Sequence, residues 1–494
     1  MTREDRNRII VLAIVFAIAG FFGITNGSYL ITAMYIITVI AAAFVVKEKD
    51  VYNLLYSVLL VSTFYDYVLH VPGIQSIYMF HIVLGIFTLV SLYKVFKDID
   101  ILRNLDKKVL SIYVIWFAYM CVSIVWALNR NLAIKYIAIY LMMFAFIVNM
   151  MIYNINKERI NKTINLVLFL VSFIIVVGVI EVALGEQLPV QHYYSGMKLS
   201  ELHRNLIQAR AIVFSFNTNN LSATLAILSP ICLFAIYRFE NILAKIWFTI
   251  ATCLGFGLVV ITTSRTGIYA MYVSLGVFVI YSICRIRTLK IQALVFSIIL
   301  CLSFVFLYYN SSKFENIKPV DGKQILDTAL DDKMKELGGE FELGGSGSLN
   351  ERGTIILDVL RGTITEKHYL GYGVGNVEQY IRNEGNSRGI YSPHCYPIEI
   401  LGDFGFPGVA LYGVYYLYLL IQNIIIGIKK KSLMCFAAVA GLIAFAPACF
   451  GPSSITYVFS YWLLMGFAVS CIQVYKNEDI GYRKTSSIKE FNMI

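Results

Sequence analysis

Three arginines and one histidine stand in short polar stretches of an otherwise apolar chain, and their types could do chemistry. Arg265 lies in TTSRTG, Arg352 in ERG, Arg210 a few residues before NTNN, and His394 after a proline in SPHCY. A planar guanidinium keeps its charge and makes paired hydrogen bonds to phosphate oxygens. An imidazole titrates near neutral pH and can take a proton from a hydroxyl group. These residue types therefore suit a site that binds phosphate beside a reacting hydroxyl.

Each of these stretches also has a plain structural interpretation. Arg265 could lie among lipid headgroups at a membrane surface, as long basic side chains do. Arg352 and Arg361 fall on a predicted amphipathic helix, where arginines are ordinary surface residues. The asparagine-rich turn with Asn217 and Asn219 is typical of helix caps. Residue type alone leaves these alternatives open.

The elements that position these residues are predicted to be membrane-spanning helices. The chain has 494 residues, 58% hydrophobic and 15% charged, whereas soluble domains carry roughly 25% charged residues. A helix needs about 20 mainly apolar residues to cross the hydrocarbon core, and about 14 segments of this chain qualify. They lie near residues 9–24, 29–46, 51–69, 77–96, 109–128, 132–153, 164–184, 220–237, 246–263, 267–285, 291–309, 404–428, 433–450 and 456–475. We predict an all-α polytopic membrane protein with about 14 transmembrane helices, within a range of about 12 to 14.

The basic residues predict the orientation of these helices. The chain has 41 Lys and Arg against 31 Asp and Glu, a net charge of +10, and most of the basic residues fall in alternate short loops. Because Lys and Arg are retained on the cytoplasmic side, both termini should be cytoplasmic. This distribution explains the basic balance, so no nucleic acid partner is expected. The arginines named above lie on the opposite, outer side.

The predicted layout divides the chain into four parts. These are N-terminal transmembrane helices (1–184), central transmembrane helices with outer arginines (185–309), a large extracytoplasmic catalytic loop (310–398), and C-terminal transmembrane helices with a short cytoplasmic tail (399–494). The loop contains a flexible GGSGS stretch and short helices expected over 351–364 and 376–383.

The order of these motifs resembles the bacterial O-antigen ligase and O-antigen polymerase superfamily. The shared pattern is TTSRTG in a short outer turn, then ER…GYGVGN in a large late loop, then PHCYPIEILGDFGFPG at the next span. His394 precedes Gly405 by eleven residues, and Gly408 follows by three, as in the family. Arg210 to Asn220 is similar to the family's arginine followed by Asn-x-Asn. The resemblance covers roughly residues 205–420.

Two features depart from the family pattern. Cys395 stands where an asparagine commonly follows the histidine, which leaves the substrate-positioning role of that position open. The ligases commonly have twelve spans, fewer than predicted here.

The resemblance implies transfer of a saccharide from undecaprenyl diphosphate on the outer face, with inversion at the anomeric carbon and no metal. On that basis Arg265 and Arg352, with Arg210 as a third, stabilise the charge that develops on the diphosphate. Removing one such preorganised donor typically costs about 2.7–4 kcal/mol. His394 is the general base for the acceptor hydroxyl, and Asp403 could orient it.

Possible supporting residues are Asp403, Asn217, Asn219 and Arg361. No cofactor and no metal are expected, because HExxH-like ligand spacing is missing from the sequence. The expected partners are the lipid-linked oligosaccharide, a glycan acceptor, the bilayer, and possible accessory proteins, a flippase and a chain-length regulator.

Three functions stay open at this point. The span count favours a polymerase of O-antigen, capsule, exopolysaccharide or a teichuronic-type polymer. A ligase that transfers the finished glycan to a lipid A core or another acceptor is the first alternative. A lipid-linked oligosaccharide flippase is the second, although His81 is the only ionisable group clearly inside a predicted span, whereas transporters place several there.

Overall fold

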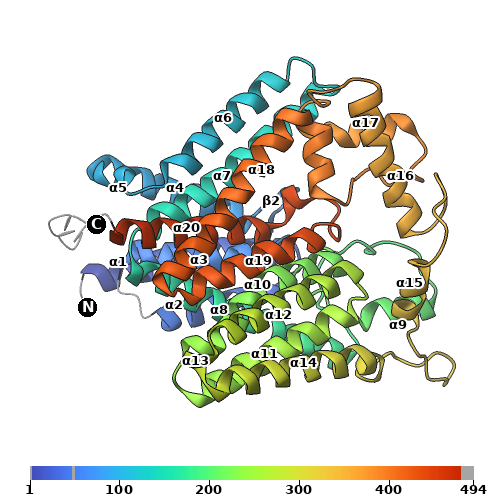
Figure 1. Ribbon diagram of the computed structural model, residues 1–494, viewed down its shortest axis with the longest axis horizontal. Helices are drawn as coiled ribbons and strands as arrows, with labels where there is room; N and C mark the ends of the chain where they lie inside the picture. The colour runs from blue at the N-terminus through green and yellow to red at the C-terminus, as the bar shows by residue number, and fades with distance from the viewer. Residues whose placement is uncertain (1–2, 47–49, 480–494) are drawn as a thin grey trace.

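The computed structural model describes residues 3–46 and 50–479, which form a long bundle of helices (Figure 1). The one sheet of the described residues pairs two short antiparallel strands, β1 (His70–Val71) and β2 (Ile74–Tyr78). The all-helical expectation is therefore confirmed for this part of the chain.

Ten helices of the described chain are long and apolar enough to cross a membrane. They are α1 (Arg3–Thr25), α2 (Tyr29–Val46), α4 (Met79–Lys97), α7 (Arg130–Tyr153), α8 (Lys157–Leu184), α10 (Thr218–Arg238), α11 (Ile242–Ile261), α12 (Arg265–Cys284), α14 (Ile291–Asn310) and α18 (Tyr396–Lys430). Two shorter apolar helices are α3 (Val51–Phe64) and α19 (Leu433–Ala448).

Two further helices, α6 (Lys107–Ser123) and α20 (Phe459–Asp479), complete the set that overlaps the predicted spans. Every predicted segment coincides with one of these helices. The chain is a multi-pass membrane protein, while the count of about 14 crossings stays a prediction.

The buried centre of the bundle is α10, which packs against α11, α12 and α19. Its first half is rich in small side chains, which let neighbouring backbones approach closely. At Gly441 of α19, a Cβ atom would lie 2.7 Å from the carbonyl oxygen of Ile227 on α10. At Gly267 of α12, it would lie 1.9 Å from the Ser222 hydroxyl. Close packing thus fixes the start of α12, where Arg265 is.

Short helices gather at one end of the bundle, opposite the start of α1 and the end of α20 (Figure 1). They are α9 (Glu201–Gln208), α15 (Ala329–Glu336), α16 (Ser348–Leu360) and α17 (Val377–Glu384). Two other short helices are α5 (Asp100–Arg103) and α13 (Ile286–Leu289). The helices expected over 351–364 and 376–383 coincide with α16, extended by a π-helical turn at Arg361–Thr365, and with α17.

Helix α18 contains a break at Gly405, where φ is 62° and ψ is −158°. The predicted span began at residue 404, whereas the helix begins at Tyr396, because a separate first segment precedes the break. A Cβ atom at Gly405 would lie 2.0 Å from the Tyr369 carbonyl oxygen, and one at Gly371 would lie 2.6 Å from the Gly405 nitrogen. The glycine cluster of the loop therefore packs its backbone directly on the backbone of α18.

Candidate functional site

Arg265 is the first residue of α12, after a turn in which Thr263 has a φ of +56°. Its guanidinium donates to the Ser348 hydroxyl at 2.8 Å and to the Lys333 carbonyl, and lies 3.3 Å from the Glu336 carboxylate. The side chain is 12% exposed. The guanidinium is thus held by α15 and α16, in contrast to the alternative that placed it among lipid headgroups.

Arg352 projects from α16 and donates to the carbonyl oxygen of Phe450 at 2.8 Å. Burial, and next the positive charge of Arg265, lowers the pKa of Arg352. Ser348, which accepts from Arg265, lies four residues before Arg352 and therefore one turn away on the same side of α16. The two arginines therefore converge from elements that are far apart in sequence.

His394 lies just before α18, with a φ of +50°. Its Nδ1 atom is 3.3 Å from the carbonyl oxygen of Gly451, and its backbone N–H donates to the Ser453 carbonyl. Since a carbonyl only accepts, Nδ1 carries the proton and Nε2 keeps a lone pair. Burial, and next the charge of Arg352, lowers the pKa of His394 to about 4. The imidazole is therefore neutral at pH 7 and able to accept a proton.

The same loop turn, which follows α19, contacts both Arg352 and His394. Phe450 and Gly451 present their carbonyl groups to these two side chains. A Cβ atom at Gly451 would lie 3.2 Å from the Thr266 hydroxyl, so the turn also packs beside the start of α12. This turn was not predicted from the sequence. It contacts Arg352 and His394 with backbone carbonyl groups, which every residue has, and not with ionisable side chains.

Arg210 is anchored by Asp327, whose carboxylate lies 2.6 Å from its Nη2 atom and is 5% exposed. The chain after Arg210 is held by Glu181 of α8, which accepts the backbone N–H groups of Ile212 and Val213 at 2.9 and 2.8 Å. Glu181 was not predicted, because one carboxylate within an apolar helix indicates no particular partner.

Lys333 on α15 joins the three arginines. Its pKa is lowered to about 8, first by burial and then by the charges of Arg210, Arg265 and Arg352. We call these four residues the cation cluster. Lys333 escaped prediction because DDKMKE has the mixed charge of a solvated segment.

Asp403 is not brought to His394. Its carboxylate accepts the backbone N–H of Val377 at 2.8 Å, and its carbonyl accepts that of Gly373 at 3.0 Å. Asp403 thus holds the glycine cluster and the start of α17, while the Gly451 carbonyl takes the orienting position that Asp403 was expected to have.

The other supporting residues have structural contacts. Arg361 is 47% exposed and pairs with Glu384, with Glu366 at 3.3 Å and with Asp358 at 3.8 Å, away from the cation cluster. Asn217 caps α10, as its structural interpretation predicts, by accepting the backbone N–H of Asn220 at 2.9 Å. Asn219 presents its backbone carbonyl toward Gly451.

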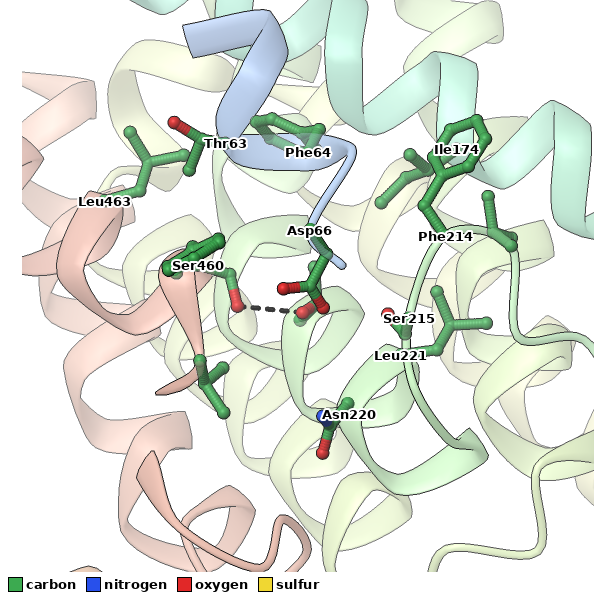
Figure 2. Close-up of a pocket in the computed structure, with 14 residues that line it drawn as sticks. Thr63, Phe64, Asp66, Ile174, Phe214, Ser215, Asn220, Leu221, Ser460 and Leu463 are labelled. Carbon is green, nitrogen blue, oxygen red and sulfur yellow. Dashed lines mark hydrogen bonds between the residues drawn. The ribbon is translucent and has the colours of Figure 1, made fainter. Parts of the chain in front are cut away.

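A small cavity lies beside the start of α10 (Figure 2). The carboxylate of Asp66 points into it (Figure 2), and Thr224 and Ser460, whose hydroxyls lie 2.8 Å apart, line it as well. Its Oδ1 atom is buried and has no hydrogen-bond partner among the described residues. Asn220 lines the same cavity.

Comparison with known proteins identifies the region that contains most of this site. Residues 250–413 match the family model described as O-antigen ligase. The match includes Arg265, Lys333, Arg352 and His394, whereas Arg210 lies before it. A search of curated proteins found no match. The resemblance to the O-antigen ligase and polymerase superfamily is confirmed over these residues, and the chain carries a domain of the O-antigen ligase family.

Proposed function

We propose that this O-antigen ligase/polymerase-type membrane enzyme is a polymerase that uses an undecaprenyl-diphosphate-linked saccharide as donor. It assembles a cell-surface polysaccharide on the outer face of the bacterial cytoplasmic membrane. The reaction inverts the anomeric carbon and needs no metal. The observation that carries the proposal is the convergence of four cations beside a neutral histidine.

The cation cluster is suited to the donor. When the bond between the anomeric carbon and the diphosphate breaks, its electron pair goes to the diphosphate oxygen, where negative charge develops. Guanidinium groups held in place before the reaction stabilise that charge without rearranging. Arg265 and Arg352 are so held, by Ser348 and by the Phe450 carbonyl.

His394 is suited to the acceptor. Its Nε2 atom takes the proton of the acceptor hydroxyl as the hydroxyl oxygen attacks the anomeric carbon from the side opposite the diphosphate. The charge of Arg352 is one cause of the low pKa of His394. A diphosphate bound to Arg352 offsets that charge, so the imidazole becomes a stronger base when the donor is present.

The acceptor distinguishes polymerase from ligase, and the test is the product pattern. The purified protein is incubated with one lipid-linked repeat unit, and the products are separated on a gel. A ladder without further additions supports the polymerase. Reaction only after a second acceptor is supplied identifies a ligase, and translocation without new glycosidic bonds identifies a flippase.

The ligase is the second candidate because the matching family model is described as O-antigen ligase. Both enzymes use the same donor chemistry, so the roles of Arg265, Arg352 and His394 are the same in either case. A flippase and a chain-length regulator remain predicted partners.

A further inference from the structure

Lys333 is a half-buried lysine held against the turn before α12. Its ammonium donates to the Thr263 hydroxyl at 2.7 Å and to the Thr263 carbonyl at 3.2 Å. Within the described part of the chain, these are its hydrogen bonds, and both acceptors are neutral. Thr263 has a left-handed φ of +56°, and its carbonyl faces Lys333 of α15.

The neighbouring Lys335 shows what an ordinary lysine on the same helix does. Its side chain is 80% exposed and lies 3.9 Å from the exposed carboxylate of Asp332. Lys333 projects from another side of the helix and meets the arginines instead. Contact with solvent therefore accounts for Lys335, but it does not account for Lys333, which faces the arginines.

Two of the four cations in the cluster have a carboxylate partner, and the other two do not. Arg210 pairs with Asp327, and Arg265 lies 3.3 Å from Glu336. Arg352 and Lys333 form no ion pair within the described residues; their contacts are carbonyl and hydroxyl oxygens. A diphosphate that is esterified at both ends carries two negative charges. The excess positive charge of the site therefore matches this ligand.

We propose that Lys333 is a diphosphate-binding residue, which together with Arg352 neutralises the two phosphate groups of the lipid-linked donor. The inference rests on the proposed function, since it assigns a further residue to the same donor site. Lys333 contributes a point charge with three donors, whereas each arginine contributes a planar fork.

Proton binding makes the proposal testable. Burial and the three arginines lower the pKa of Lys333 to about 8 in the empty site, and a bound anion raises it. Donor binding therefore takes up a proton above that pH. Affinity should be highest below about pH 8 and should fall by up to tenfold per pH unit above it.

Other ionisable groups face the same space. Besides the arginines, Asp327 faces Lys333, Glu336 pairs with Arg265, and His394 titrates only at about pH 4. Glu315 needs a control, because burial, and next the charge of Asp327, raises its pKa to about 8. Its ionisation would also weaken anion binding, so each measurement is repeated with Glu315→Gln.

The experiment measures binding to the purified full-length chain in detergent by calorimetry, from about pH 6 to about pH 10. The probe is farnesyl diphospho-N-acetylglucosamine, a diphosphate diester whose phosphates do not titrate in this range. Lys333→Met should weaken binding by about tenfold or more and remove the fall in affinity above pH 8. Lys333→Arg should keep the affinity and extend it to high pH. Lys335→Met, the matched control, should behave as the unaltered protein.

The results separate a failure of the Lys333 assignment from a failure of the whole donor site. If Lys333→Met binds as tightly as the unaltered protein, or keeps its pH profile, the assignment is wrong. If Lys333→Met does not fold, Lys333→Arg decides, because a retained decline above pH 8 rejects the role. If Arg352→Ala binds normally or the probe does not bind at all, the proposed donor site fails, and Lys333 with it. Loss in Arg352→Ala with normal binding in Lys333→Met rejects Lys333 alone.

Discussion

The cation cluster and the cavity around Asp66 both lie near the start of α10, but they differ in the partners of their ionisable side chains. In the cluster, Arg210 and Arg265 have carboxylate partners, and the two cations left over face a site suited to an anion. In the cavity, the Asp66 carboxylate faces two hydroxyls and has no ion pair among the described residues. A buried polar atom without a hydrogen-bond partner is costly. The excess positive charge of the cluster therefore suits an anionic ligand. Asp66, by contrast, lowers the stability of the folded chain slightly.

One of the two largest effects is expected for Arg352→Ala, which removes a cation without an ion pair from the cluster. The rate of polymer formation from a purified lipid-linked repeat should fall by about 10²–10³, or about 2.7–4 kcal/mol. Arg361→Ala is the matched control, since Arg361 directly follows α16 and belongs to a separate group of ion pairs. Equal loss in both variants would mean that the loop, and not the site, had been damaged.

A loss of about 10²–10⁴ in rate is expected for His394→Gln, which removes the base. The pH profile of the unaltered enzyme is the sharper measurement. Activity needs neutral His394, so kcat/KM should decline as pH falls through about 4, the pKa in the empty enzyme. In kcat the decline should occur at higher pH, because the bound diphosphate offsets Arg352. Coincident inflections would contradict this electrostatic link, and His203→Gln, in the exposed α9, should change neither profile.

A moderate gain in affinity is expected for Glu336→Gln. This change removes the carboxylate next to Arg265, so the guanidinium becomes fully available to the diphosphate. The probe should bind roughly three- to tenfold more tightly by calorimetry, or about 0.6–1.4 kcal/mol. Glu340→Gln changes an exposed carboxylate of the same loop and should have no effect. Weaker binding in Glu336→Gln would indicate that Glu336 orders the site and does not compete with the ligand.

The last comparison concerns stability and not catalysis, and it makes the same Asp-to-Asn substitution in both regions. Asp327→Asn breaks the ion pair with Arg210 and should lower the free energy of unfolding by about 1.5–3 kcal/mol. Asp66→Asn replaces a buried carboxyl group, whose Oδ1 atom has no hydrogen-bond partner among the described residues, with an amide that can donate to a neighbouring hydroxyl. It should raise the free energy of unfolding by about 1 kcal/mol, with polymer formation unchanged. Thermal unfolding of both proteins in the same detergent measures the difference. Loss of activity in Asp66→Asn would give the cavity a functional role.

Much of the site could be predicted because its motifs are local. The turn TTSRTG and the spacing from His394 to Gly405 carry the family resemblance, and on that resemblance Arg265 and His394 were predicted as site residues. Lys333 could not be found this way, since the same helix carries the solvated Lys335 and only tertiary packing separates them. The Gly451 carbonyl was also invisible, because every residue has such a group. Asp403 was misassigned, since sequence distance does not reveal which N–H groups a carboxylate will accept.

The fold shows the same division. Apolar length located the helices, because the bilayer constrains each one separately. The break in α18 was missed, since a glycine within an apolar span does not by itself indicate a left-handed residue. The path of residues 310–348 was also beyond prediction, because contacts with α12 fix it and local pattern does not.

The backbone contact between Gly371 and Gly405 has a practical consequence for dissecting the protein. A soluble fragment of residues 310–398 would lose Gly405, and with it the surface against which the glycine cluster is shaped. It would also lose the Phe450 carbonyl that holds Arg352 and the Thr263 oxygens that hold Lys333. The loop therefore cannot be assayed as a detachable domain; donor binding is a property of the assembled chain.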